Sequence, residues 1–271
     1  MRVFPCLSGV LYVTALIVAT YLLLAYAVLP WMWTHYEQQQ GLQSHPMVTR
    51  TVQGIPGDPL NVGLVGSKDE IVHAILAAGW SPADPVTVGT SLEIAGSVLF
   101  ERPYRNAPVS PLFYAGRRED LAFEKEHGSS ADQRHHVRLW QVLESGAESR
   151  PVWLGSATFD RGVELSRYTG QITHRIASDI DEERDTLVHD LSRTGMSKTI
   201  YQVTGIGPTL IGRNGGGDRY YTDGEIKIIV TLSSGETARE APQMIRAPAA
   251  AALKDALWRK LKGIFAVRDQ P

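Results

Sequence analysis

The stretch from Gly205 to Gly224 has the most unusual combination of residue types in the chain. Three consecutive glycines lie inside it, flanked by the polar residues Arg213, Asn214, Asp218 and Arg219. Glycine allows positive φ angles and close approach of other groups to the backbone. A flexible linker would be rich in Gly and Ser and would lack the adjacent tyrosines found here. We therefore predict a shaped polar loop that leads into a strand, with successive backbone amides able to accept an anion.

A second polar motif is Arg134-His-His-Val-Arg138. In a strand, alternation places His135 on the face of Val137, while His136 shares the other face with the two arginines. A histidine beside two arginines suits an anionic partner, although an ordinary exposed polar face is an equal alternative. The ligand-binding candidates are His136, Arg138, Arg213, Asn214, Gly215, Gly216, Gly217 and Arg219.

Acid–base chemistry requires a carboxylate and a histidine that meet in space. The catalytic candidates are His174 with Asp218 or Asp223. A metal site built from His135, His174 and Asp218 or Asp223 is a weaker candidate, and we expect no metal because histidines in β-rich proteins are more often structural. No sequence motif indicates a cofactor. The segment Gly207 to Asn214 resembles a phosphate loop, but Arg213 stands where that loop needs lysine.

Composition limits the class of protein. The chain has 271 residues, 43% of them hydrophobic, and a formal net charge of -2. That charge excludes a nucleic-acid binder that works through bulk positive charge. The single cysteine, Cys6, allows neither an internal disulfide nor a thiolate metal cluster.

Residues 1–36 are predicted to contain a transmembrane helix. Val10 to Leu29 is an apolar run long enough to cross a hydrocarbon core of about 30 Å. Trp31, Trp33 and Tyr36 follow where an interfacial aromatic belt would lie. The alternative is a cleaved signal peptide, since Ala25-Tyr26-Ala27 resembles a cleavage site, but the apolar run is longer than such peptides need.

The orientation in the membrane depends on one basic residue. Arg2 is on the amino-terminal side of the apolar run, and the positive-inside rule then places the amino terminus in the cytoplasm. We expect a single-pass membrane protein whose body lies outside the cytoplasm.

Residues 37–59 are rich in Gly and Pro and are predicted to be a tether. The folded body is predicted to span residues 60–240. Within it, a capping box of Ser67 and Glu70 opens a helix, and Arg134–Leu143 and Val152–Phe159 are typical of strands. The pattern predicts an α+β fold, with a mixed, largely antiparallel sheet and two or three packing helices behind the transmembrane helix.

Residues 247–268 are predicted to form a basic amphipathic helix. Leu253, Leu257 and Leu261 share one face, and Lys254, Arg259, Lys260 and Lys262 lie elsewhere. Packing on the body is one interpretation of the apolar face, and contact with an anionic membrane surface is the other.

Several segments together resemble the LssY carboxyl-terminal domain family. They are PLNVGLVGS (59–67), GRREDLAFEKE (116–126), RHHVRLW (134–140), VWLGSATFDRGVELS (152–166), DIDEERD (179–185) and GRNGGGDRYYTDGE (212–225), the last being the most specific. The resemblance implies a domain behind a membrane helix, joined in larger relatives to DedA-like and lipid-phosphatase-like membrane domains. It therefore implies work at a bacterial membrane with such proteins as partners, and it supplies no catalytic residue.

Three functions follow from these observations. The first is a membrane-anchored domain that binds an anionic or phosphorylated, lipid-linked ligand. The second is a hydrolase or transferase that acts on lipid-linked phosphate, and the third is an interaction module for a neighbouring membrane protein.

Overall fold

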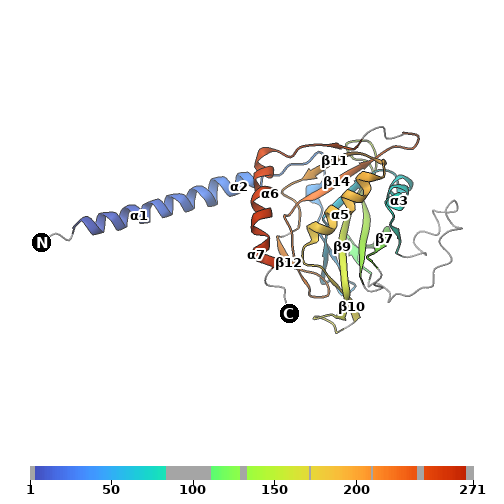
Figure 1. Cartoon of the computed structure of the whole chain (residues 1–271), viewed down its shortest axis with the longest axis horizontal. Coiled ribbons are helices and arrows are strands. Elements are labelled where there is room, and N and C mark those ends of the chain that lie inside the picture. Colours follow the sequence, from blue (N-terminus) through green and yellow to red (C-terminus); the bar gives the residue numbers. More distant parts are fainter. Residues whose placement is uncertain are drawn as a thin grey trace.

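The computed structural model describes residues 4–83, 111–128, 133–170, 172–208, 210–236 and 241–266. A long amino-terminal helix extends from one side of a body built from strands and helices (Figure 1). Strands and helices neither alternate regularly along the chain nor separate into two halves, as expected of an α+β domain. The predicted α+β class is therefore confirmed.

The amino-terminal helix is continuous from α1 (Phe4–Leu23) through the π-helical turn η1 (Leu24–Val28) into α2 (Leu29–Met32). Ser8–Met32 has a mean hydropathy of 2.1 and is long and apolar enough to cross a membrane. At 1.5 Å per residue, this stretch extends about 37 Å, against a hydrocarbon core of about 30 Å. Large apolar side chains such as Tyr12 and Leu16 are exposed along it.

In the described part of the chain, the principal sheet has nine strands, in the order β15-β11-β14-β3-β9-β8-β7-β4 with β10 paired to β9. Their bounds are β3 (Val62–Val65), β4 (Ser81–Pro82), β7 (Leu121–Glu126), β8 (Arg134–Leu143), β9 (Val152–Leu165), β10 (Ile172–Ile176), β11 (Ser197–Val203), β14 (Ile226–Thr231) and β15 (Gln243–Met244). Two of these pairings, β14 with β3 and β11 with β15, are parallel, and the others are antiparallel. The predicted mixed, largely antiparallel sheet is confirmed.

Two helices, α3 (Lys68–Ala77) and α5 (Ile180–Arg193), cover one face of this sheet (Figure 1). Ile71 and Leu187 pack with Leu64 and Val137 of the sheet in a single apolar cluster. The predicted capping box begins α3: the Ser67 side chain accepts from the Glu70 amide, and Glu70 accepts from the Ser67 amide.

A second layer covers the opposite face of the sheet. It consists of a four-stranded sheet in the order β2-β1-β5-β6 and the hairpin β12-β13. The bounds are η2 (Leu42–Ser44), β1 (Val48–Arg50), β2 (Pro56–Pro59), β5 (Phe113–Tyr114), β6 (Arg117–Arg118), β12 (Ile211–Arg213) and β13 (Arg219–Tyr221). Leu42, Leu60 and Leu112 pack on Trp140 and Leu154 of the principal sheet.

The segment predicted as a tether, residues 37–59, is folded instead. Leu42 and Thr49 are fully buried, and β1 pairs with β2. The glycines and prolines form a tight hairpin: a Cβ on Gly57 would lie 2.5 Å from the Thr49 hydroxyl. A segment rich in Gly and Pro can form turns as well as a linker. Here β1 and β2 lie so close together that a larger residue would not fit at Gly57.

Helices α6 (Ala249–Leu261) and α7 (Gly263–Ala266) lie where α2 meets the body (Figure 1). The buried side chains of α6 are Ala250, Ala251, Lys254 and Trp258. The predicted carboxyl-terminal helix is therefore present through Ala266, the last described residue.

Leu42→Ala tests whether this segment belongs to the core. Because Leu42 is fully buried, we expect the change to lower the free energy of unfolding by about 2–5 kcal/mol. Val52→Ala in the same segment, at an exposed position, should change it by less than about 0.5 kcal/mol. Urea unfolding of the detergent-solubilised chain, followed by tryptophan fluorescence, measures both. Equal, small effects would mean that the segment is a tether after all.

Candidate functional site

Alternate side chains of β8 and β9 form a buried polar layer on the sheet face away from α3 and α5. Its members are Arg134, His136 and Arg138 on β8, and Ser156, Thr158 and Asp160 on β9, each no more than 8% exposed. In the antiparallel register, His136 lies opposite Thr158, and Arg138 lies opposite Ser156. The intervening residues Val137 and Ala157 point into the apolar cluster beneath the helices. His136 therefore shares a face with both arginines, as its place in the strand predicts.

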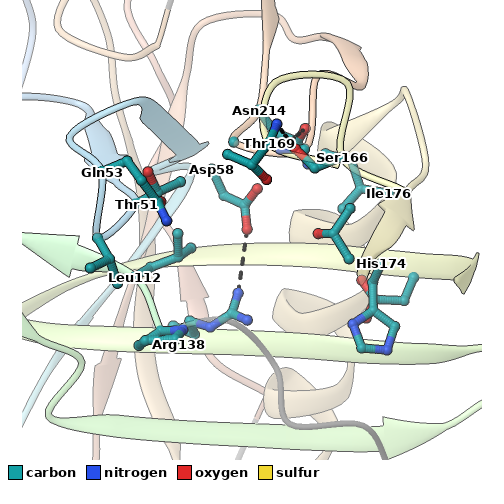
Figure 2. Close-up of a pocket in the computed structure, with 16 residues that line it drawn as sticks. Thr51, Gln53, Asp58, Leu112, Arg138, Ser166, Thr169, His174, Ile176 and Asn214 are labelled. Carbon is teal, nitrogen blue, oxygen red and sulfur yellow. Dashed lines mark hydrogen bonds and ion pairs between the residues drawn. The ribbon is translucent and has the colours of Figure 1, made fainter. Parts of the chain in front are cut away.

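A cavity of about 260 Å³ lies between this layer and the second layer. Figure 2 shows residues of both layers around it. The lining residues come from the β1–β2 turn, β2, the segment just before β5, β8, β9, the turn between β9 and β10, β10 and the glycine loop. They are Thr51, Val52, Gln53, Asp58, Pro111, Leu112, Arg138, Asp160, Ser166, Thr169, Thr173, His174, Ile176, Asn214, Gly215 and Gly216. The volume accommodates a small polar group and is below that of sites for drug-sized ligands.

Arg138 and Asp58 join the two layers at this cavity. Nη1 of Arg138 donates to Oδ2 of Asp58 at 3.3 Å (Figure 2). Burial raises the pKa of Asp58 above its ordinary value, and the nearby charge of Asp160 adds to the increase. The charge of Arg138 and a hydrogen bond with Asn214 oppose this increase without cancelling it. The counter-charge of Arg138 is thus a carboxylate that takes up a proton more readily than an exposed aspartate.

Asp160 lies between two histidines. Its Oδ2 is 3.0 Å from Nε2 of His136 and 3.8 Å from Nδ1 of His174. Burial acts to raise the pKa of Asp160, but the hydrogen bond and charge of His136, with the charges of His174 and Arg138, lower it overall. Asp160 therefore stays ionised while Asp58, across the cavity, is easier to protonate.

His174 reaches the cavity from β10, which pairs with the end of β9. Burial lowers its pKa below the ordinary value, and the charges of His136, Arg134 and Arg138 lower it further. Asp160 opposes this shift but does not reverse it. Near neutral pH, His174 is accordingly a neutral imidazole close to a carboxylate.

The glycine loop, residues 214–218, connects β12 to β13. Oδ1 of Asn214 accepts hydrogen bonds from the amides of Gly216 at 3.0 Å and Asp218 at 2.9 Å. The Gly217 amide donates to the Asn214 carbonyl. Gly217 has a φ of +98°, and a Cβ on Gly215 would lie 2.5 Å from Cγ2 of Thr51. These glycines are therefore required by the backbone geometry and by close contact.

Two of the three glycine amides in the predicted anion-accepting concavity are already bonded within the loop. The Asn214 carboxamide already occupies the position of an anion at the Gly216 amide, and the Gly217 amide is used within the loop. The loop contributes a wall of the cavity, through Asn214, Gly215 and Gly216, more than it contributes donors.

The structure brings some ligand-binding candidates together and separates others. Arg138, Asn214, Gly215 and Gly216 line the cavity, and His136 contacts Asp160 in its floor. Among the described residues, Gly217, Arg213 and Arg219 are not part of the lining. Arg213 donates to the Gly217 carbonyl from outside the loop, and Arg219 is exposed beside it on β13.

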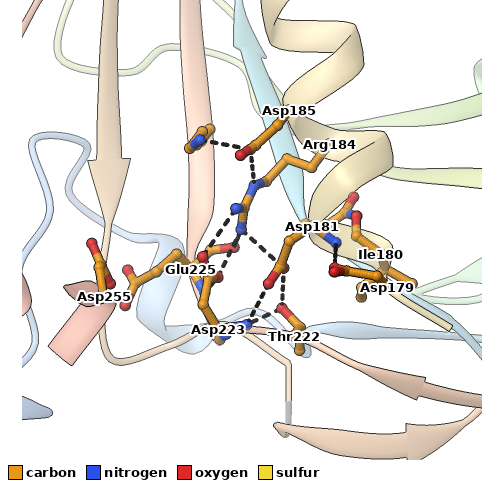
Figure 3. Close-up of polar contacts among 12 residues, drawn as sticks. Asp179, Ile180, Asp181, Arg184, Asp185, Thr222, Asp223, Glu225 and Asp255 are labelled. Atoms are coloured by element: carbon orange, nitrogen blue, oxygen red, sulfur yellow. Dashed lines mark hydrogen bonds and ion pairs between the residues drawn. The ribbon is translucent and has the colours of Figure 1, made fainter. Parts of the chain in front are cut away.

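The catalytic candidates have different partners in the described contacts. Oδ2 of Asp218 accepts from the Ile176 amide at 3.1 Å, and its carboxyl group contacts Glu164. Asp223 belongs to a different cluster, where the guanidinium of Arg184 donates to both of its oxygens at 2.7 and 3.0 Å (Figure 3). Asp223 therefore attaches α5 to the segment that follows β13. The carboxylate near His174 is that of Asp160 instead.

The candidate metal set of His135, His174 and Asp218 is also separated. His135 points to the helix side of the sheet, where Nδ1 lies 2.7 Å from Oε2 of Glu183, whereas His174 faces the cavity. In the described ranges, no group of three or more His, Cys, Asp and Glu side chains is arranged to hold a metal ion.

Sequence reasoning missed two carboxylates of the site. Asp58 lies in the segment predicted to be a tether, and Asp160 is not among the candidates that the sequence suggests. A usable signal was present in β9, where Ser156, Thr158 and Asp160 alternate with apolar residues. Two-residue spacing of polar side chains in an otherwise apolar strand indicates one polar face. The hydroxyls of Thr51, Ser166, Thr169 and Thr173 come from turns and strand ends that carry no such pattern.

The arrangement offers two kinds of chemistry. A buried guanidinium, a neutral imidazole and several hydroxyls can donate hydrogen bonds to a small anionic group. A histidine beside an ionised aspartate can also transfer protons, because the carboxylate stabilises the imidazolium when it forms.

Asp218→Asn tests the electrostatics at the end of the glycine loop. Burial, followed by the hydrogen bond with Glu164, raises the pKa of Asp218 from 3.8 to about 7. Its contribution to stability is therefore complete at low pH and is lost as the pH rises through about 7. We therefore expect the free energy of unfolding of Asp218→Asn, relative to that of the native chain, to be higher at about pH 8 than at about pH 5. Urea unfolding measures this difference.

The matched control is Asp69→Asn, at an exposed position on α3. Its free energy of unfolding should follow the native pH profile. A parallel profile for Asp218→Asn as well would contradict the raised pKa of Asp218.

Comparisons with known proteins support one assignment. Neither the search of curated proteins nor the search of solved structures gave a match. The family model described as LssY C-terminus matches residues 42–226, which is more than half of the chain. The match begins at Leu42, inside the segment that the sequence suggested was a tether, and it includes β8, β9, β10 and the glycine loop. The chain therefore belongs to the LssY C-terminal domain family, as its motifs predicted.

Proposed function

We propose that this protein is a membrane-anchored domain that binds a small anionic group, such as the phosphate of a lipid-linked compound, in the cavity beside Arg138. One observation carries the proposal: a buried guanidinium reaches a polar cavity, and its only described partner is a carboxylate with a raised pKa. An arginine fork suits phosphate and carboxylate groups. When Asp58 takes up a proton, Arg138 is free to bind an external anion.

Surrounding groups support this ligand class. His174 can become a charged donor when an anion is present, because an opposite charge raises a histidine pKa. Thr51, Ser166 and Thr173 place hydroxyls around the cavity. Hydroxyls both donate and accept, so they can bind phosphate oxygens without adding charge.

The predicted pH dependence has one sign. The pKa of His174 is lowered and that of Asp58 is raised, so at neutral pH the cavity contains a neutral imidazole and an acidic group. As the pH falls, His174 gains a positive charge and Asp58 loses its negative charge. Both changes favour an anion, so we expect affinity for sulfate to rise from about pH 8 to about pH 5. Sulfate remains a dianion over this range, so the change reports on the protein.

Arg138→Gln should weaken sulfate binding by about ten- to hundredfold, the usual value of a hydrogen bond to a charged group. Arg219→Gln is the matched control, because Arg219 is exposed on β13 outside the cavity lining. Isothermal titration calorimetry on the detergent-solubilised chain measures both. If the glutamine variant unfolds, Arg138→Lys is the alternative, because it keeps the positive charge beside Asp58. It should still bind sulfate more weakly than the native chain, because the guanidinium fork is lost. Equal binding by the Arg138 and Arg219 variants would contradict the proposal.

A second candidate function is hydrolysis or transfer at a phosphate ester. The specific observation is the pair of Asp160 and His174 at the same cavity, 3.8 Å apart. In this case, His174 would act as the base and Asp160 would stabilise its charged form. The assay is hydrolysis of phosphatidate or p-nitrophenyl phosphate. Catalysis, and not binding alone, would be favoured if His174→Gln abolished this turnover and retained sulfate binding.

We also propose that Ser8–Met32 anchors the protein in a bacterial inner membrane, with the body outside the cytoplasm. The supports are the apolar helix and the basic residue Arg2 before it. Alkaline phosphatase fused after Pro271 should be active and sediment with membranes. An inactive fusion would reverse the topology, and a soluble active one would indicate a cleaved signal.

A further inference from the structure

The carboxyl-terminal helix packs on the body through an unusual face. Its buried residues are small, except for Lys254 and Trp258. Nζ of Lys254 forms an ion pair with Glu225 and donates to the Asp223 carbonyl at 2.8 Å. Asp255, the acidic residue of α6, is paired with the same lysine at 3.0 Å. Polar contacts of Lys254 and the close approach of small residues thus attach α6 to the body, while its leucines stay partly exposed.

Beside this buried face, α6 and α7 carry large apolar side chains that are exposed. Leu253 is 44% exposed, Leu257 42%, Leu261 48% and Ile264 62%. Leu253, Leu257 and Ile264 follow helical spacing, so they form one stripe. The charged residues of α6 that are exposed, Arg259 and Lys260, are both basic. An exposed apolar stripe with basic neighbours is the pattern of a helix that lies in a membrane interface.

The position of this stripe relative to the amino-terminal helix gives an independent argument. Helix α2 packs against α6, and the Trp33 ring lies 4.7 Å from Nζ of Lys254. Just beyond, Tyr36 exchanges two backbone hydrogen bonds with Thr204, at 3.0 and 2.8 Å. The end of the apolar helix is therefore fixed to the body beside α6.

Figure 1 shows how these helices are oriented. Helices α6 and α7 run across the direction of α1, on the side of the body from which α1 extends. If α1 follows the membrane normal, α6 and α7 lie along the membrane surface. These helices then lie at the level of Trp31 and Trp33, where interfacial aromatic residues are found.

We infer that α6 and α7 form a second membrane contact, which lies in the interface of an anionic bilayer. Leu253, Leu257 and Ile264 enter the boundary between headgroups and acyl chains, and Arg259 and Lys260 contact anionic headgroups. The inference rests on the proposed anchoring of α1. Two contacts in different directions fix the orientation of the body, whereas a single helix would leave it free to rotate.

The test uses the full chain in vesicles with equal amounts of phosphatidylcholine and phosphatidylglycerol. Cys6→Ser removes the native thiol, and single cysteines at Leu257 or Ile264 carry a fluorophore. Leu16→Cys reports on the anchor, and Asp69→Cys, on the exposed surface of α3, is the aqueous control. Lipids with a nitroxide near the headgroup quench labels that lie in the interface, and lipids with a nitroxide deep in the acyl chain quench the label at position 16 if α1 spans the bilayer.

We expect labels at positions 257 and 264 to be quenched severalfold more than the label at position 69. Lys260→Glu combined with Arg259→Glu should reduce this quenching, whereas Lys68→Glu on α3 should not. Quenching at position 16 but not at positions 257 and 264 would overturn the inference and leave the anchor intact. Absence of quenching at position 16 would instead reject the anchor itself. The labels at positions 257 and 264 could also be shielded from aqueous iodide without being quenched by the nitroxide lipids. That result would show that a protein covers this face, and it would also overturn the inference.

Discussion

Ionisable groups buried between two layers of strands are the constraint on which the rest of this structure depends. Arg138, Asp58 and Asp160 are each no more than 8% exposed. An unpaired charge at such a place costs several kcal/mol, so the groups must lie where they satisfy one another. That requirement places β2 over β8 and β9, because Asp58 is the described partner of Arg138. The cavity remains polar for the same reason, since apolar side chains there would leave these groups without partners.

The hairpin β12-β13 connects this polar layer to the side of the molecule where the apolar helix ends. At one end, Asn214 organises the glycine loop against the cavity. At the other, Asp223 is bound by Arg184 of α5, and its carbonyl accepts from Lys254 of α6. Lys254 in turn lies over Trp33, at the end of α2. The cavity and the membrane-proximal helices are therefore attached to the same short hairpin.

The sequence predicted the features that depend on local pattern. The apolar run, the capping box at Ser67 and the alternation that places His136 beside Arg138 are each encoded within a few residues. It failed where a residue's role depends on distant contacts. Gly57 and Pro59 are typical of a linker when only the sequence is considered. In the fold, Thr49 and Leu112 lie against Gly57, and this contact makes the segment a packed hairpin. From the sequence alone, Asp223 remains a catalytic candidate. Its structural role becomes visible only in the fold, where Arg184, 39 positions away, binds both of its oxygens. Asp58 and Asp160 become neighbours of one cavity only after β2 covers β9.

The central claim is that the cavity beside Arg138 receives an anion. The most direct measurement is the titration of the His174 imidazole by NMR, in the presence and absence of sulfate. In the free protein, burial and neighbouring positive charges lower the pKa of His174. A bound anion would add a negative charge next to the ring, so the account predicts that sulfate raises this pKa. It also predicts that the shift disappears in Arg138→Gln. An unchanged His174 titration at sulfate concentrations that saturate the protein would contradict the account, because the anion would then bind elsewhere.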